Sequence, residues 1–351
     1  MIVHVRGRAL PDGEFVDLYA DGDRWTTEPV PGAELVAEGW LLPGLVDAHT
    51  HPGTEEPGDP LDPDLLRADL HEHVRAGVTM IRSPGLAGEP PDWFGRDADV
   101  PRAVHAGHWL AQHGQFFDNW GRRAEPDELI ELAVAQAART GWCKIIGDWL
   151  PGDEPVPVEV LRAIVEGAHA AGGRVAVHSQ QAAGGANAVA AGVDSLEHGM
   201  CLDAELLTTM AAQGTALTPT LSVLNGALAR AKNRPDSPRK DWIVEGAGRH
   251  GALTAAAAEA GVTVLAGTDS RPHGRVMDEI RALVDAGVPA HDALGAGSWR
   301  ARKYLGLPGL AEGAPADAVV YDEDPRGDPD QLTVPRAVVL RGTVAHRRNA
   351  G

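Results

Sequence analysis

Two histidines one residue apart, His49 and His51, lie at the end of an apolar run that begins at Leu41. The run is typical of a buried strand, and side chains two residues apart on a strand project from the same face. Both imidazoles can therefore point to one place, and neutral imidazole is the commonest metal ligand in proteins. The pair alone is equally compatible with core packing, so the prediction depends on groups further along the chain.

Four further residues with suitable chemistry each lie on or at the end of a short apolar run: Lys144, His178, His198 and Asp269. Each has an ordinary explanation when taken alone. His178 could be a core histidine, and His198 could face the surface. Asp269 could cap a helix, and Lys144 could pair with Asp148. Their common position at strand ends favours one shared site over four separate coincidences.

The elements that would position these groups alternate regularly along the chain. Eight apolar runs are predicted as strands, at residues 41–48, 78–82, 102–106, 142–146, 174–177, 194–197, 214–219 and 262–266. Alanine-rich helical stretches lie between them, at residues 127–140, 157–171, 182–191, 204–213, 249–260 and 276–286. The polar stretch 230–240 is predicted as a loop. Eight βα units of this kind close into a TIM barrel, whose active site lies at the carboxyl ends of the strands.

The ends of the chain have a different character, with short β segments at residues 1–40 and again from about 313 to 346. We therefore predict an α/β protein with two domains. Residues 1–42 and 306–351 form a small β-sandwich, and residues 43–305 form a metal-dependent (β/α)8 barrel. In such a barrel all six candidate groups meet at one mouth, and histidine with carboxylate suits Zn, Mn, Fe or Co better than Ca or Mg.

Composition limits the partners. The chain has 351 residues, 43% of them hydrophobic, and a formal net charge of -19, which disfavours nucleic acid and anionic membranes. Two cysteines imply no disulfide framework. The first residues lack the pattern of a signal peptide, and no apolar stretch is long enough to span a bilayer. We expect a cytoplasmic enzyme with a small-molecule or peptide substrate, and these features are compatible with a homo-oligomer.

Four motifs carry a resemblance to a known family. They are residues 43–51 (Pro-Gly-Leu-Val-Asp-Ala-His-Thr-His), 175–178 (Val-Ala-Val-His), 191–199 (Ala-Gly-Val-Asp-Ser-Leu-Glu-His-Gly) and 266–269 (Ala-Gly-Thr-Asp). With the tail at 312–321, they resemble the amidohydrolase superfamily of metal-dependent hydrolases, over nearly the whole chain. The stretch 194–199 is most similar to the prolidase-like and imidazolonepropionase-like branch.

The resemblance implies roles for individual residues. His49, His51 and Asp269 would bind the more buried of two divalent ions, zinc first, with Mn, Co or Fe as alternatives. His178 and His198 would bind the more exposed ion. Lys144 would bridge the two as a carbamate formed with carbon dioxide, and burial favours that reaction because it lowers a lysine's pKa.

The expected reaction is hydrolysis of an amide-type C–N bond in a dipeptide, an N-acyl amino acid or a cyclic amide. A metal-bound hydroxide would attack the carbonyl. Asp269 would accept the proton of the attacking water and pass it to the leaving amine. A non-catalytic metal-binding barrel and a mononuclear hydrolase of a cyclic amide stay open as alternatives.

Two departures from family patterns narrow this expectation. Deaminases of the superfamily carry a glutamate three residues after the strand-five histidine, where this chain has Gln181, which argues against aromatic-base deamination. Imidazolonepropionases lack the strand-four lysine, so Lys144 favours the prolidase-like side. We expect Trp109, Trp120 and Trp149 to line part of the mouth.

Substrate contacts are less defined by the sequence. An arginine clamp for a substrate carboxylate is expected from among five residues near strand ends, with Arg82 first. The others are Arg122, Arg123, Arg271 and Arg275. His113 is the second expected substrate contact, Glu55 and Glu56 are placed on the first loop at the mouth, and Asp47 is expected to tune a ligand.

Overall fold

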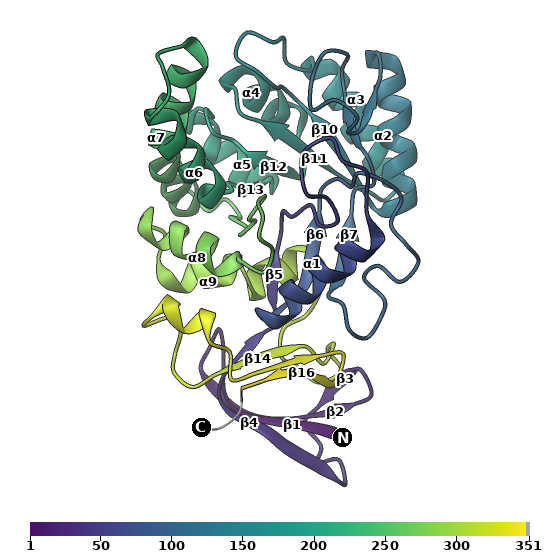
Figure 1. The fold of residues 1–351 in the computed structure, drawn as a ribbon, viewed down its shortest axis with the longest axis vertical. Helices are drawn as coiled ribbons and strands as arrows, with labels where there is room; N and C mark the ends of the chain where they lie inside the picture. Colours follow the sequence, from purple (N-terminus) through teal and green to yellow (C-terminus); the bar gives the residue numbers. More distant parts are fainter. Residues whose placement is uncertain (349–351) are drawn as a thin grey trace.

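The computed structural model describes residues 1–348 as a (β/α)8 barrel with a small β domain built from both ends of the chain (Figure 1). The predicted fold class is confirmed. The domain boundaries at 42/43 and 305/306 stay a proposal. None of the helices described for residues 1–348 is long and apolar enough to cross a bilayer.

A mixed seven-stranded sheet forms the small domain, in the order β16-β15-β14-β4-β1-β2-β3. Its strands are β1 (Ile2–Ala9), β2 (Glu14–Asp21), β3 (Arg24–Thr26), β4 (Ala33–Pro43), β14 (Ala318–Tyr321), β15 (Ala337–Leu340) and β16 (Thr343–Arg347). The central strand β4 pairs in parallel with β1 and antiparallel with β14, so the two ends of the chain share one sheet.

Seven of the eight predicted barrel runs contain a strand, whereas residues 262–266 form only an isolated bridge to Leu217, and the strands at 109–111 and 122–123 were not predicted. The barrel strands are β5 (Leu45–Asp47), β6 (Val78–Ser83), β7 (Arg102–His105), β8 (Trp109–Ala111), β9 (Arg122–Arg123), β10 (Trp142–Ile146), β11 (Arg174–Ser179), β12 (Ser195–His198) and β13 (Ala216–Thr218). The eighth segment pairs with β13 through two backbone hydrogen bonds only. Leu217 N donates to Thr263 O and Leu265 N donates to Leu217 O, each at 2.9 Å.

Two predicted strands are interrupted. The run predicted at 41–48 divides at Gly44, a position where any side chain would collide with Thr79. Barrel strand three divides into β7, which pairs with β6, and β8, which pairs with β10. Gln136 donates to the carbonyls of Ala106 and His108 in this gap, so the interrupted backbone keeps hydrogen-bond partners.

Helices surround the barrel on its outer side. They are α1 (Pro63–Arg75), α2 (Pro126–Thr140), α3 (Val158–Ala170), α4 (Ala182–Ala191), α5 (Leu207–Gln213), α6 (Leu221–Lys232), α7 (Pro238–Glu259), α8 (Val276–Asp285), α9 (Ala290–Ala296) and α10 (Trp299–Tyr304). Local signals explain their ends: a capping box between Glu125 and Glu128 begins α2, and Gly141, with φ 79°, ends it.

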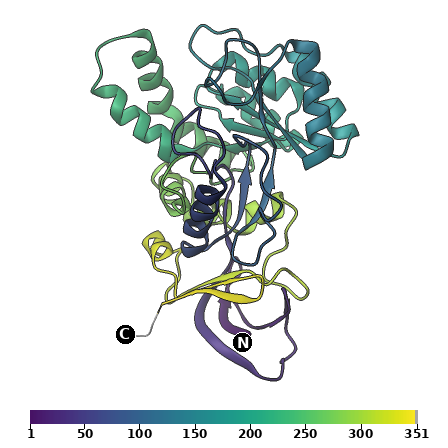
Figure 2. The same cartoon turned by 45° about the vertical axis from the view of Figure 1, so that its right-hand side comes forward.

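The loop predicted at 230–240 is confirmed only for residues 233–237, and its two ends are wrong. Residues 230–232 end α6 and residues 238–240 begin α7, and the two helices form a hairpin that projects from the barrel (Figure 2). The Ser237 hydroxyl accepts a hydrogen bond from Lys240 N, and Pro238 occupies the first turn. Proline is tolerated there because the first turn lacks intrahelical partners for its N–H groups.

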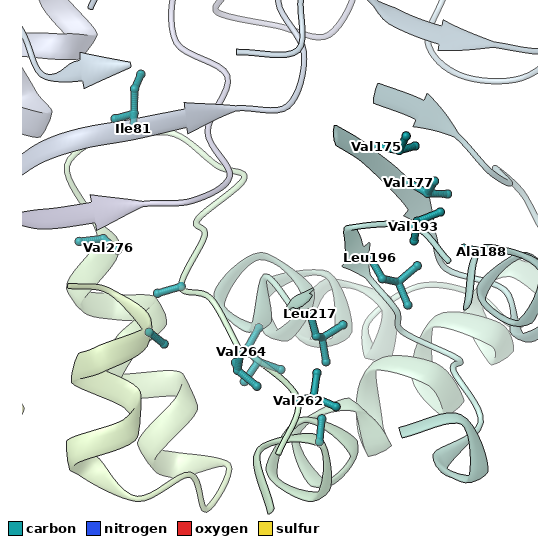
Figure 3. Packing of buried hydrophobic residues seen from close by; sticks show 14 of the residues in the cluster. Ile81, Val175, Val177, Ala188, Val193, Leu196, Leu217, Val262, Val264 and Val276 are labelled. Atoms are coloured by element: carbon teal, nitrogen blue, oxygen red, sulfur yellow. The ribbon is translucent and has the colours of Figure 1, made fainter. Parts of the chain in front are cut away.

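Alternation along the strands decides which side chains face the inside of the barrel. Val175 and Val177 project from β11 on the side of Ala188 and Leu196, in the core between strands and helices (Figure 3). Ala176 and His178 therefore face the opposite side. The same rule sends Cys143 and Ile145 of β10 to the helix side and Lys144 to the inside.

Candidate metal centre

The three ligands predicted for the buried ion lie together at the mouth. Nε2 of His49 and Nε2 of His51 are 3.1 Å apart, and Oδ1 of Asp269 lies 3.6 Å and 3.4 Å from them. These are the three residues whose ligand atoms all lie within 4.8 Å of one another in the described part of the chain. Asp269 N donates to the carbonyl of His49 at 2.8 Å, which ties the eighth segment to the first.

Neighbouring groups fix the orientation of both rings. Nδ1 of His49 lies 2.7 Å from the Glu197 carboxylate, and Nδ1 of His51 lies 2.8 Å from the carbonyl of Gly85. Each partner only accepts, so each neutral ring carries its proton on Nδ1. Both Nε2 atoms then present lone pairs toward each other and toward a carboxylate oxygen. Three acceptors at such distances without a donor between them suit a bound cation.

The other three predicted ligands complete the same pocket. The rings of His178 and His198 have centroids 4.6 Å apart, and those of His49 and His198 are 5.1 Å apart. Nζ of Lys144 and Nε2 of His178 are buried and have no hydrogen-bond partner within residues 1–348. Unpaired buried polar atoms are costly. Both line the pocket, so a group other than protein would satisfy them.

Three residues at strand ends adopt the left-handed backbone region that favours glycine: His198 (φ 66°), Thr220 (φ 50°) and Asp269 (φ 49°). Strict alternation would place His198 on the side of Leu196, away from the pocket. The positive φ turns its ring to the mouth, where Nδ1 lies 2.8 Å from the Thr220 hydroxyl. Such strain is typical of functional sites.

Burial sets the protonation of the cluster. It lowers the pKa of His49 to about 4 and that of His198 to about 3, and holds the pKa of His178 well below its usual range. Burial alone would raise the pKa of Asp269, but its interactions with His49, His51 and His198 hold it below its usual value. Neutral imidazoles and an ionised carboxylate are the forms that bind metal.

Lys144 has a lowered pKa of about 8 because of burial, although Glu197 opposes the shift. The alternative that it pairs with Asp148 is wrong. The Asp148 carboxylate accepts hydrogen bonds from Ser179 and from the backbone N–H groups of Gln180 and Gln181 instead.

The structure does not support Arg82 as a substrate contact. Arg82 is 1% exposed and lies inside the barrel, where its guanidinium donates to Glu197 (2.8 Å), Thr218 (3.0 Å) and the carbonyl of Ala48. Met80 and Arg82 share one face of β6, while Ile81 packs toward the helices. The side chain of Arg82 therefore does not reach the mouth, although the residue lies at the end of its predicted strand.

His113 is also outside the pocket. Its side chain is 62% exposed and belongs to a separate hollow lined by residues such as Gln112, Glu125 and Glu154. Glu55 and Glu56 are exposed and do not line the pocket either. Asp47 accepts hydrogen bonds from Thr268 and from the backbone N–H of His49, so its oxygens join the two segments that carry ligands.

Aromatic side chains form the rest of the pocket. The predicted Trp109, Trp120 and Trp149 line it, together with Phe116 and Phe117, which the sequence analysis missed. Glu197 was also missed as a partner of His49. The sequence did contain a signal for Glu197, because a charged residue within an apolar strand must have a partner inside the barrel.

Comparison with known proteins gives a consistent result. The model of the amidohydrolase family matches residues 40–345. An uncharacterised protein of Mycobacterium tuberculosis is 40% identical over 361 residues, which covers 97% of this chain and 95% of that protein. Ochratoxinase of Aspergillus niger is 32% identical over 188 residues, which is 51% of this chain and 39% of ochratoxinase.

Solved structures share the whole fold. A Xaa-Pro dipeptidase with bound methionine is similar with a TM-score of 0.83 and 23% identity, covering 98% of this chain and 99% of that one. The A. niger ochratoxinase structure is similar with a TM-score of 0.83 and 22% identity, covering 100% and 96%. At these identities the likeness establishes the architecture and leaves the substrate to be argued from the pocket.

Proposed function

Since the chain belongs to the amidohydrolase family, we propose that its barrel mouth binds divalent metal and hydrolyses an amide-type C–N bond. One observation carries the proposal. Nε2 of His49, Nε2 of His51 and Oδ1 of Asp269 face one another within 3.6 Å, while each Nδ1 is committed to a different acceptor. A bound cation would make such an arrangement favourable.

The donor set fits two ions. His49, His51 and Asp269 would hold one, and His178 and His198 the other, with Lys144 between them. The buried, unpaired Nζ of Lys144 and Nε2 of His178 support this assignment. Imidazole with carboxylate favours zinc, manganese, cobalt or iron. Bound ions of this kind polarise a carbonyl oxygen and make a coordinated water more acidic.

Asp269 is placed to move a proton. Its Oδ1 faces His49 and His51, while Oδ2 is turned toward His198, with 3.9 Å between Oδ2 and Nδ1. The lowered pKa keeps the carboxylate ionised, so it can accept the proton of the water that attacks the amide carbonyl. The same oxygen then returns the proton to the departing nitrogen. The C–N bond breaks, and a carboxylic acid and an amine are formed.

Lys144 would act as a bridging carbamate. Its free amine adds to the carbon of carbon dioxide, an N–C bond forms, and one proton leaves for solvent. The reaction requires the neutral amine, and the lowered pKa of about 8 makes that form accessible. An ammonium group cannot bind a cation, whereas a carbamate offers two anionic oxygens.

The test combines metal replacement with a substrate panel. The purified chain is stripped with a chelator, reloaded separately with Zn²⁺, Mn²⁺ or Co²⁺, and assayed with dipeptides, N-acyl amino acids and cyclic amides. We expect hydrolysis that disappears with the metal and returns on reloading, and a loss of about 100-fold or more in Asp269→Asn. Asp285→Asn is the control, since Asp285 is exposed at the end of α8.

Two outcomes would favour the alternatives. Metal binding without hydrolysis of any amide would favour a non-catalytic metal-binding barrel. A single ion per chain, with activity independent of bicarbonate, would favour a mononuclear hydrolase. The second alternative has some structural support, because His49, His51 and Asp269 alone form the compact three-ligand group found within residues 1–348.

A further inference from the structure

One side of the pocket is a wall of five aromatic rings, which we call the aromatic wall: Trp109, Phe116, Phe117, Trp120 and Trp149. Its buried base is Trp109, which stacks on Trp120 with a centroid distance of 4.7 Å and lies 5.1 Å from the ring of His51. Its rim is formed by Phe116, Phe117 and Trp149. The ring of Trp149 lies 5.4 Å from that of His178, so the wall directly adjoins the ligand cluster.

The wall is held in place without a ligand. Arg123 donates hydrogen bonds to the carbonyls of Phe117 and Trp120. Nε1 of Trp120 donates to the carbonyl of Asp59 at 2.7 Å, and the Gln115 side chain donates to Glu154 O at 2.9 Å. These bonds fix the backbone of the loop and the ring of Trp120, so that part of the wall loses little conformational freedom when a second ring packs against it, which favours binding.

The rest of the pocket lining contains one other polar side chain. Apart from the six candidate ligands and the five rings, its lining consists of Ile146 and Gln180. The pocket has a volume of about 160 Å³, close to the roughly 150 Å³ of a cavity that accommodates a benzene ring, and it opens to solvent beside Phe117 and Trp149. Ions held by the candidate ligands would occupy its floor, so an aromatic group would lie against the wall toward the mouth.

Four of the five arginines expected to clamp a substrate carboxylate have other partners. Arg82 is bound to Glu197, and Arg123 to backbone carbonyls of the wall. Arg271 pairs with Asp69 at 2.7 Å, and Arg275 pairs with Asp278. The fifth, Arg122, lines a separate hollow with Glu89 and His108. Among residues 1–348, no arginine lines the pocket.

We propose that the aromatic wall is a binding site for an uncharged aryl group, and that the substrate is a small neutral aryl amide without a free carboxylate. This inference rests on the proposed function for the hydrolytic step, but the wall itself would bind such a group in the absence of turnover. Aromatic rings prefer stacked or edge-to-face partners, and the wall contains both: Trp109 stacks on Trp120, while Phe116 and Phe117 meet Trp149 edge-to-face.

The test uses ligands that no amide hydrolase can cleave. Acetophenone and cyclohexyl methyl ketone share a carbonyl and differ in having an aromatic or a saturated ring. We expect calorimetry on the full chain to show acetophenone binding about three- to tenfold more tightly. A second pair, 4-acetylbenzoate and 4-methoxyacetophenone, tests the charge, and we expect the carboxylate to give no gain.

Variants locate the effect. Phe117→Leu and Trp149→Leu alter the rim, and both should reduce the aryl preference to less than about twofold, while Trp149→Phe should restore it. Trp40→Leu is the matched control, because Trp40 is a half-buried tryptophan of β4 in the small domain. Equal binding of both ketones, or at least about tenfold tighter binding of 4-acetylbenzoate, would overturn the proposal.

An activity comparison separates the two proposals. With metal supplied, acetanilide should be hydrolysed faster than N-cyclohexylacetamide. If the ketone preference holds but neither amide is cleaved under any condition, the aromatic wall stands and the proposed hydrolysis fails. If amides are cleaved with no aryl preference and the ketones bind equally, the hydrolysis stands and the aromatic site fails.

Discussion

Nδ1 of His49 lies 2.7 Å from a carboxylate oxygen of Glu197, and both groups are fully enclosed by the barrel. The same carboxylate is held by Arg82 at 2.8 Å and by the hydroxyl of Ser195. Glu197 therefore fixes both the ring orientation and the tautomer of His49, and directs the lone pair of Nε2 to the mouth. Carboxylates in this position make a histidine a stronger ligand.

Glu197→Gln should weaken metal binding about 10- to 100-fold, because an amide cannot accept the Nδ1 proton as strongly as a carboxylate. Competition with a chelator for Zn²⁺ measures the change. Glu279→Gln is a matched control, since Glu279 is equally buried but accepts from Leu221 N and Ser222 N instead. Unchanged affinity for Zn²⁺ in a folded Glu197→Gln chain would show that Glu197 does not contribute to metal binding.

Lys144→Ala should lower the metal content from two ions per chain to about one, because the proposed bridge is lost. Elemental analysis of chains prepared with added bicarbonate measures the ratio. Lys232→Ala, at an exposed position at the end of α6, should leave it unchanged. A Lys144→Ala chain that still holds both ions would show that the lysine is no ligand.

Stability should fall as the pH rises from about 4.5 to about 7 on account of Glu279. Burial raises the pKa of this carboxyl from 4.5 to about 7 in the folded chain. The folded state therefore holds its proton over a range in which the unfolded state has released it. Linkage then lowers the free energy of unfolding by as much as about 3 kcal/mol across that range.

Urea unfolding at a series of pH values measures this effect, and the comparison is between the native chain and Glu279→Gln. The glutamine cannot titrate, so the variant should show a flatter dependence between pH 4.5 and 7. Parallel curves for the two chains would mean that Glu279 is not the group responsible.

His113→Ala should leave kcat/KM within about twofold, because the exposed imidazole lies in a different hollow from the ligands. Gln180→Ala is the informative comparison. Gln180 lines the pocket, so removal of its side chain should raise KM. Steady-state kinetics on both variants shows which of the two residues contributes to substrate binding. A loss of tenfold or more in His113→Ala would restore the role expected from the sequence.

The sequence predicted the barrel and its candidate ligands because both depend on local regularities. Strand alternation and strand ends place Lys144 and His178 without any knowledge of the rest of the chain. The need for glycine at position 44 comes from its close approach to Thr79, and alternation alone would have turned His198 away from the pocket. Those features depend on contacts between distant segments.

The errors have a common physical cause as well. Arg82 ends its strand in the sequence, yet its guanidinium turns inward because Glu197 requires a partner inside the barrel. The second half of α7 was predicted as a helix at 249–260, but α6 and the first half of α7 were missed because the segment that joins them is rich in polar residues. Pairing between buried charges and the packing of a projecting element both require three-dimensional information.

Four rings of the aromatic wall come from the single stretch between Trp109 and Trp120, which follows the break in barrel strand three. The candidate ligands come from five other segments. Exchanging the loop between β8 and β9, which carries Phe116, Phe117 and Trp120, would therefore alter the aromatic wall and leave the segments that carry the candidate ligands unchanged. Such a modular arrangement offers a simple evolutionary route by which relatives with one catalytic chemistry diverge toward unrelated amides.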